Sequence, residues 1–146
     1  MEERHSRDDD TRPTATTLDD VDPPAWPAPA ADATALIRRV HALRAVPLAN
    51  LTAEDLRLLI SQDVARPTLV PLALEVLHRD PLIEGAHYPG DLLQAVLCVP
   101  DVHWRAHPGQ LLALRECLSR LDRNDPRYPT LGDDELESAV ERFTTT

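Results

Sequence analysis

The sequence predicts an all-α fold: a single compact domain of about six helices around a central helical pair, preceded by a disordered N-terminal tail. Aromatic residues make up only 3% of the 146 residues and only four glycines are present, so Leu, Ala and Val must form the core. This composition favours helix over a turn-rich β fold, and no segment alternates with a strand's period. Two segments within residues 69–99 are apolar on nearly every face, with Glu75 and Gln94 as the main interruptions. We expect those two segments to be the central pair.

Residues 1–31 differ in composition from the rest of the chain. They carry eight acidic and three basic side chains and five prolines, for a net charge of −5. Because they offer little apolar surface to bury, we expect a disordered, acidic, Pro-rich tail, with the helical domain spanning residues 32–146. Trp26, between Pro24 and Pro27, is either a docking residue that folds back onto the domain or an aromatic side chain tolerated in a tail.

The first helix is predicted over residues 32–45, capped by Asp32 or Thr34 and stopped by Pro47. Its apolar face comprises Leu36, Ile37, Val40 and Leu43. Thr52 is expected to cap a second helix that runs through Gln62. The buried stripe of this second helix comprises Leu56, Leu59 and Ile60.

The central pair has its own start and stop signals. Thr68 is expected to cap the third helix, with Pro71 in its first turn, where a missing N–H is tolerated. This helix ends near Arg79 because Pro81 disfavours helical geometry at the preceding residue. Asp91 is predicted to open the fourth helix as an N-cap in a capping box with Gln94, and Pro100 marks the end of that helix.

The last third of the chain contains two further predicted helices. Residues 101–107 form a short connector of about one helical turn, after which Pro108 begins a fifth helix. Its apolar face comprises Leu111, Leu114, Leu118 and Leu121. An acidic helix follows Gly132, and its apolar positions are Leu136, Ala139, Val140 and Phe143. Their spacing of three, four and seven residues is that of one helix face.

The net charge of −10 limits the classes of partner. Nucleic acid and anionic membranes would repel this chain, so a basic protein is the expected counterpart, unless the acidity serves only solubility. No apolar run is long enough for a membrane span, and the N-terminus has no apolar signal core, which predicts a cytoplasmic protein. Cys98 and Cys117 both fall in helical apolar patterns and are expected to be buried thiols.

A possible enzymatic site lies in the connector between the central helices. That connector carries His78, Asp80, Glu84, His87, Tyr88 and Asp91. Such residues could bind a metal or perform acid–base chemistry, but their spacing fits no ligand pattern, and His103 and His107 have no third ligand nearby. The sequence also lacks a nucleophile elbow and a phosphate-binding glycine loop. We therefore predict no metal and no cofactor, and keep a hydrolase that uses His87, Tyr88 and Asp91 as the alternative.

Several acidic residues have no obvious structural task. Glu75 lies on a nearly all-apolar helix, so its carboxylate must either pair with an arginine or reach the surface and contact a partner. Glu137 and Glu141 extend one acidic face of the last helix beyond the first turn, where helix electrostatics would explain acidic residues.

Several segments of residues 51–121 form a recognisable set: Leu56–Gln62, Leu72–Leu77, Asp80-Pro-Leu, Tyr88-Pro-Gly-Asp-Leu-Leu and Trp104. In these segments the chain resembles the immunity proteins of contact-dependent growth inhibition systems, and the resemblance spans residues 51–121. It implies a small cytosolic protein without catalytic activity that binds and neutralises a toxin's C-terminal domain, often a nuclease, delivered by a neighbouring bacterial cell. The motif residues that it implies are Tyr88, Pro89, Gly90, Asp91 and Trp104.

These observations combine into one functional hypothesis and two alternatives. The hypothesis is an immunity protein that occludes the active site of a basic toxin domain. The candidate toxin-binding residues are Glu75, Asp80, Glu84, His87, Tyr88, Glu137 and Glu141. The alternatives are the small hydrolase and a helical adaptor that recruits partners through its tail.

Overall fold

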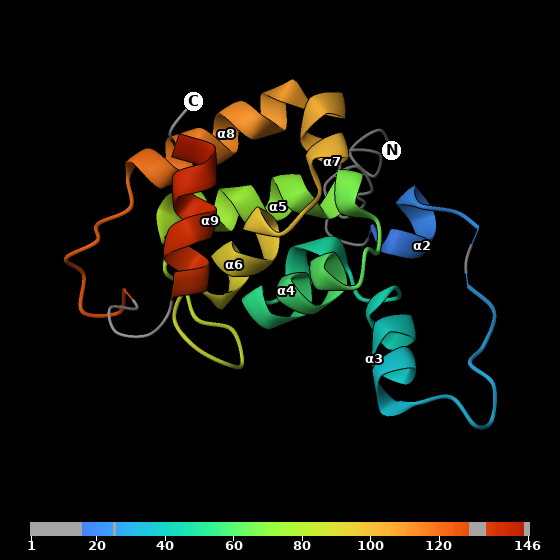
Figure 1. Ribbon diagram of the computed structural model, residues 1–146. Helices are drawn as coiled ribbons and strands as arrows, with labels where there is room; N and C mark the ends of the chain where they lie inside the picture. Colours follow the sequence, from blue (N-terminus) through green and yellow to red (C-terminus); the bar gives the residue numbers. More distant parts are fainter. Residues whose placement is uncertain (1–15, 25, 129–133, 145–146) are drawn as a thin grey trace, which may run out of the picture. The chain divides into compact units, whose positions relative to one another are not determined.

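The computed structural model describes residues 16–24, 26–128 and 134–144 and confirms the all-α fold (Figure 1). These residues form eight α-helices and one 3₁₀-helix, with no strand among them. By its internal contacts the chain divides into two compact units, residues 1–52 and residues 53–146.

The first unit contains α2 (Leu18–Val21), α3 (Ala35–Leu43) and the 3₁₀-helix η1 (Leu48–Asn50). Thr34 caps α3 as predicted, because its hydroxyl oxygen accepts a hydrogen bond from the Ile37 N–H at 3.2 Å. Only half of the predicted apolar face of α3 is buried. Val40 and Leu43 are inside, whereas Leu36 and Ile37 are 42% and 50% exposed.

Ordered structure extends N-terminally of the boundary expected at residue 32. Arg44 is completely buried, and its guanidinium donates to Asp19 Oδ1 at 3.0 Å and to Asp22 Oδ2 at 3.1 Å. It also donates to the Asp22 carbonyl at 2.7 Å and lies 4.6 Å from the ring centroid of Trp26. A buried cation is costly without such partners, so Asp19, Asp22 and Trp26 are held to Arg44 by charge. Burial of apolar surface adds to this, because Leu18 of α2 is fully buried, which the tail prediction did not foresee.

The expected tail is therefore described only in part. Residues 16–24 and 26–31 are described and include α2, while residues 1–15 lie outside the described part of the chain. The Trp26–Arg44 contact favours the docking alternative for Trp26, whose side chain nevertheless stays 41% exposed.

The second unit comprises six helices: α4 (Ala53–Ser61), α5 (Arg66–Arg79), α6 (Asp91–Leu97), α7 (Asp101–Ala106), α8 (Pro108–Ser119) and α9 (Asp134–Thr144). Helix α5 lies between α4 and α8 and also contacts α6, and α6 in turn contacts α4 and α9 (Figure 1). The predicted central pair is thus α5 and α6. Their buried apolar residues are Leu69, Val70, Ala73, Leu74, Leu77, Leu92, Leu93, Val96 and Leu97.

The predicted start of the third helix is wrong. Ala65 takes a left-handed backbone conformation (φ 50°), and α5 begins at Arg66, so Thr68 is a helical residue and not the cap. Pro67 rather than Pro71 occupies the first turn, where no N–H is needed. Pro71 lies inside the helix and deprives the Pro67 carbonyl of its intrahelical donor. The Gln110 amide of α8 donates to that carbonyl at 3.5 Å.

The C-terminal helices follow the predictions in part. Leu114 and Leu118 of α8 are buried, but α8 ends at Ser119, so Leu121 lies beyond the helix, and Leu111 and Leu121 are only partly buried. The connector at residues 101–107 contains α7, and α8 begins at Pro108. All four predicted apolar positions of α9 are buried: Leu136, Ala139, Val140 and Phe143. Trp104 of α7 is buried against Phe143 at a ring-centroid distance of 5.9 Å, and its indole N–H donates to the Val99 carbonyl at 3.0 Å.

One of the two cysteine predictions is wrong. Cys117 is buried, and its thiol donates to the Leu74 carbonyl at 3.6 Å. Burial is the main reason that the pKa of this thiol is raised. Cys98, at the C-terminal end of α6, is exposed.

Candidate functional site

The loop between α5 and α6, residues 80–90, is held by the Asp91 carboxylate. Asp91 Oδ1 accepts from the Gly85 N–H at 2.7 Å, and Oδ2 accepts from the His87 N–H at 3.0 Å and, weakly, from the Tyr88 N–H at 3.4 Å. Asp91 is only 3% exposed. The predicted capping role is therefore wrong: Gly90 occupies the N-cap position, and Asp91 is the first helical residue, whose side chain turns back to the loop.

A second carboxylate, from Glu54 of α4, holds the same loop. Glu54 Oε1 accepts from the Ala86 N–H at 2.8 Å, and both carboxylate oxygens accept from the Arg57 guanidinium at 2.7 and 2.6 Å. The hydrogen bonds from Arg57 are the main reason that the pKa of Glu54 falls to about 2, with a further contribution from the Ala86 N–H. Sequence reasoning missed Glu54, because its role depends on a contact 32 residues along the chain.

Two glycines make this arrangement possible. A Cβ atom on Gly85 would lie 2.7 Å from Glu54 Oε1 and 3.0 Å from Asp91 Oδ2, so only glycine lets the loop approach both carboxylates. Gly90 has φ 87°, a left-handed conformation that other residues adopt at a cost. The Tyr-Pro-Gly-Asp-Leu-Leu motif thus encodes a helix start, a loop anchor and two fully buried leucines, Leu92 and Leu93.

The anchored loop presents three of the candidate toxin-binding residues to solvent. Glu84 and His87 are exposed, and Tyr88 is 39% exposed. His87 and Tyr88 also line a small cavity of about 330 Å³ together with Arg57 and Cys98. Within the part of the chain that the structure describes, no hydrogen bond links His87 to the Cys98 thiol. The carboxylate of Asp91, the third residue of the hydrolase alternative, is occupied by backbone N–H groups.

Two other candidate residues have internal partners. Glu137 of α9 accepts from the Tyr128 hydroxyl and from Arg123 Nε at 3.2 Å. Asp80 accepts from Arg127 Nη1 at 3.0 Å. Both carboxylates therefore fasten the segment that follows α8, and the hydrogen bond from Tyr128 is the main reason that the pKa of Glu137 is lowered. Glu141, one turn later on α9, is exposed.

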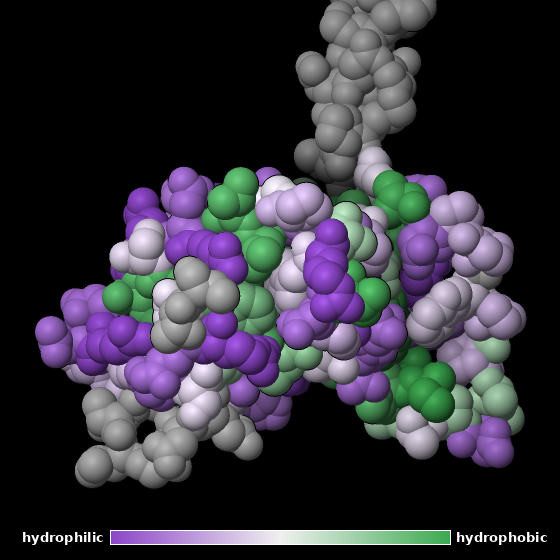
Figure 2. Space-filling model, turned by 45° about the horizontal axis from the view of Figure 1, so that its top comes forward, coloured by the Kyte–Doolittle hydropathy of each residue, from purple (hydrophilic) through white to green (hydrophobic). Residues whose placement is uncertain are grey.

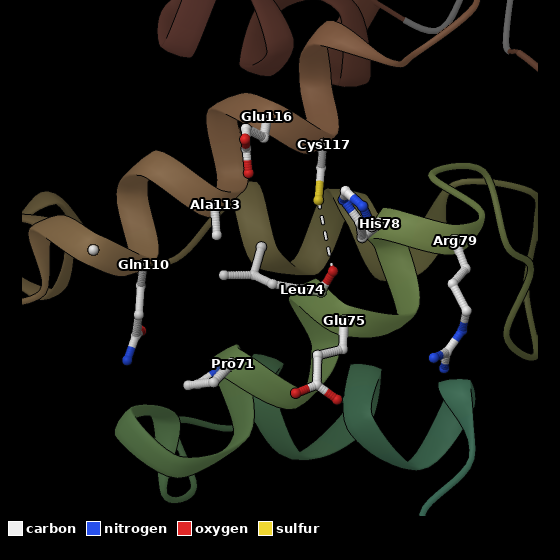
Figure 3. Close-up of a pocket in the computed structure, with 10 residues that line it drawn as sticks. Pro71, Leu74, Glu75, His78, Arg79, Gln110, Ala113, Glu116 and Cys117 are labelled. Atoms are coloured by element: carbon white, nitrogen blue, oxygen red, sulfur yellow. Dashed lines mark hydrogen bonds between the residues drawn. The ribbon is translucent and has the colours of Figure 1, made fainter.

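Glu75 lies at an open groove between α5 and α8 (Figure 3). The groove has a volume of about 480 Å³ and an apolar floor that includes Leu74 and Ala113. Glu75 is exposed, and no ion pair or hydrogen bond of its carboxylate occurs among the described residues. The internal salt bridge that the sequence left open for Glu75 is therefore not seen in the described part of the chain.

The histidines of α7 have structural partners. His103 Nε2 lies 2.8 Å from Gln110 Oε1, and His107 Nδ1 lies 2.9 Å from the His103 carbonyl. Because the Gln110 amide nitrogen donates to the Pro67 carbonyl, the Gln110 oxygen accepts a hydrogen bond from the Nε2–H of His103. Burial lowers the pKa of His103. Across residues 16–24, 26–128 and 134–144, no group of three His, Cys, Asp or Glu side chains could hold a metal.

The visible face in Figure 2 carries its hydrophobic side chains in separate groups divided by hydrophilic ones. Among the described residues, no helix is both long enough and apolar enough to span a membrane.

The Asp91 anchor predicts an unusual pattern of substitution. Asp91→Ala should lower the free energy of unfolding by about 1–3 kcal/mol, because partly buried N–H groups of Gly85 and His87 lose a charged acceptor. Asp91→Asn should lower the free energy of unfolding by at least half of the amount lost in Asp91→Ala, because the NH₂ group of asparagine would face an N–H donor of the loop. Urea unfolding measures both, and an Asn variant as stable as the wild type would restore the capping role, in which Asn and Asp are equivalent.

The low pKa of Glu54 predicts a stability that depends on pH. Because folding lowers this pKa from about 4.5 to about 2, the contribution is fully present above pH 4.5 and is lost as the pH falls towards 2. Glu54→Gln should therefore be less stable than the wild type at pH 7, and this difference should shrink between pH 4.5 and 2. Arg57→Gln removes the main cause of the low pKa of Glu54. In thermal melts, this variant should also be less stable than the wild type at pH 7, and the difference should shrink between pH 4.5 and 2. A difference that stays constant down to pH 2 would contradict this assignment.

Comparison with known proteins agrees with the resemblance seen in the sequence. Residues 20–114, which include α3 to α7 and the anchored loop, match the family of CDI (contact-dependent growth inhibition) immunity proteins. A search of the curated proteins finds no match. The match covers well over half of the chain, and it includes the loop, the glycines and both carboxylates described above. The chain therefore belongs to the family of CDI immunity proteins.

Proposed function

We propose that this protein protects its cell by binding the C-terminal domain of one cognate contact-delivered toxin and covering the toxin's active site, without performing a reaction itself. The observation that carries the proposal is the family match over residues 20–114. We further propose that the toxin is a nuclease, that the complex forms in the cytoplasm, and that nucleic acid and membranes are not partners of this chain.

Charge supports a basic partner. The chain carries a net charge of −10. A nuclease domain needs a positively charged active site to bind the phosphates of nucleic acid. Opposite charges would speed the encounter, and a stable complex would bury roughly 1,600 Å² in total. An acidic protein that covers a basic active site would exclude the nucleic acid both sterically and electrostatically.

Exposure sorts the candidate contact residues. Glu75, Glu84, His87, Tyr88 and Glu141 are accessible to a partner. Asp80 and Glu137 are only half-exposed, and their mutation would also loosen the segment after α8 through the loss of their ion pairs with Arg127 and Arg123. We therefore propose the accessible five as the better probes of toxin binding.

The hydrolase alternative has no supporting geometry among the described residues, because the Asp91 carboxylate already accepts hydrogen bonds from the backbone N–H groups of the loop. An adaptor that recruits through its tail gains no support either, since Asp19, Asp22 and Trp26 of the expected tail pack on Arg44.

The proposal predicts tight, salt-sensitive binding to the C-terminal domain of the toxin encoded directly upstream. The purified protein should abolish that domain's activity at equimolar concentration. Because charge steers the encounter, the association rate should fall about tenfold or more between about 0.05 and 0.5 M salt, while the dissociation rate changes less. Stopped-flow mixing measures both rates. An absence of binding and protection, together with turnover of a small substrate that His87→Ala abolishes, would overturn the proposal.

A further inference from the structure

The groove between α5 and α8 is built from small and apolar residues on both helices. Leu74 of α5 is 5% exposed and Cys117 of α8 is 1% exposed, and Pro71 and Ala113 complete the floor. A volume of about 480 Å³ is in the range of sites that hold a substantial ligand group. The thiol of Cys117 donates to the Leu74 carbonyl, so its polar atom is already satisfied inside the floor (Figure 3).

Two carboxylates line this groove, one from each helix. Glu75 extends from α5 and Glu116 from α8, and both residues are exposed (Figure 3). Within the described part of the chain, neither side chain forms a hydrogen bond or an ion pair. A cation that enters the groove would therefore meet two acceptors without first having to break an internal pair.

The other charged and titratable groups of the groove leave its character acidic. Arg79, at the last residue of α5, is the one arginine among the described lining residues, and its side chain points away from Glu116 (Figure 3). His78 lies beside Cys117 near the same end of the groove (Figure 3). Arg79 is four residues after Glu75, a spacing that allows pairing, yet the two are not within ion-pair distance.

We infer that this groove is a contact site for the toxin and receives an arginine side chain of the toxin domain, together with an adjoining apolar residue. The inference rests on the proposed function and states where on the surface of this protein the toxin binds. An apolar floor suits the methylene stem of arginine, whose charged head can then reach polar groups at the edge. The planar guanidinium can bind a carboxylate with two parallel hydrogen bonds, which a compact lysine ammonium cannot do.

The charge of the groove is tested with a matched pair of double variants. Glu75→Gln with Glu116→Gln should raise the Kd for the upstream-encoded toxin domain at least tenfold, mainly through faster dissociation. Asp32→Asn with Asp101→Asn makes the same change in net charge at exposed sites outside the groove, and it should raise the Kd less than threefold. Arg79→Gln should lower the Kd, because it removes a positive charge near the groove that repels the toxin's arginine.

The insertion itself is tested by filling the groove. Gly109 lies in the first turn of α8 and lines the groove, and a Cβ atom there would meet nothing within 4 Å. Gly109→Leu should therefore keep the melting temperature, or raise it, since leucine is a better helix former than glycine. It should nevertheless weaken toxin binding at least tenfold.

The outcomes separate this inference from the proposed function. If the wild type binds and the two double variants behave alike, the groove is not the contact. If the Glu75/Glu116 variant is weakened but Gly109→Leu binds normally, the carboxylates act at a distance and no side chain inserts. If the wild type does not bind the toxin domain at all, the proposed function itself fails. Calorimetric titration and thermal melts of each variant supply all of these readouts.

Discussion

The second unit depends on two carboxylates that bind backbone N–H groups of one loop. Asp91 and Glu54 together accept hydrogen bonds from residues 85–88, and Glu54 connects that loop to α4. The loop joins the two central helices, so its conformation sets where α6 begins relative to α5. Gly85 is required at the point where both carboxylates approach the chain. Without these contacts, the buried faces of α5 and α6 would have no fixed connection.

Much of the fold could be predicted from the sequence, because hydrophobic periodicity reports burial directly. The face of α9, the stripe of α4 and the Thr34 cap of α3 all follow from spacing and local chemistry. The features that were missed depend on partners distant in sequence. Asp91 followed by Gln94 has the pattern of a capping box. The Asp91 carboxylate instead accepts hydrogen bonds from the N–H groups of Gly85 and His87, which precede the helix.

The buried ion pairs were hidden from sequence reasoning for the same reason. Arg44 lies near the end of the first predicted helix and outside its apolar face, and only the folded chain brings Asp19, Asp22 and Trp26 to it. The site was predicted less well than the fold. Periodicity marks which residues face inward, but it does not reveal that Glu137 pairs with Arg123 or that Glu116 stands across a groove from Glu75.

The most recognisable motif of the chain thus maintains the structure, whereas the residues proposed to contact the toxin lie on exposed surfaces. Hydrogen–deuterium exchange of the protein with and without the toxin domain tests this division most directly. The account predicts that the amides of Gly85 and His87 exchange slowly in both states, and that binding adds protection along the groove-lining parts of α5 and α8. Binding of the toxin domain without added protection on α5 or α8 would contradict it.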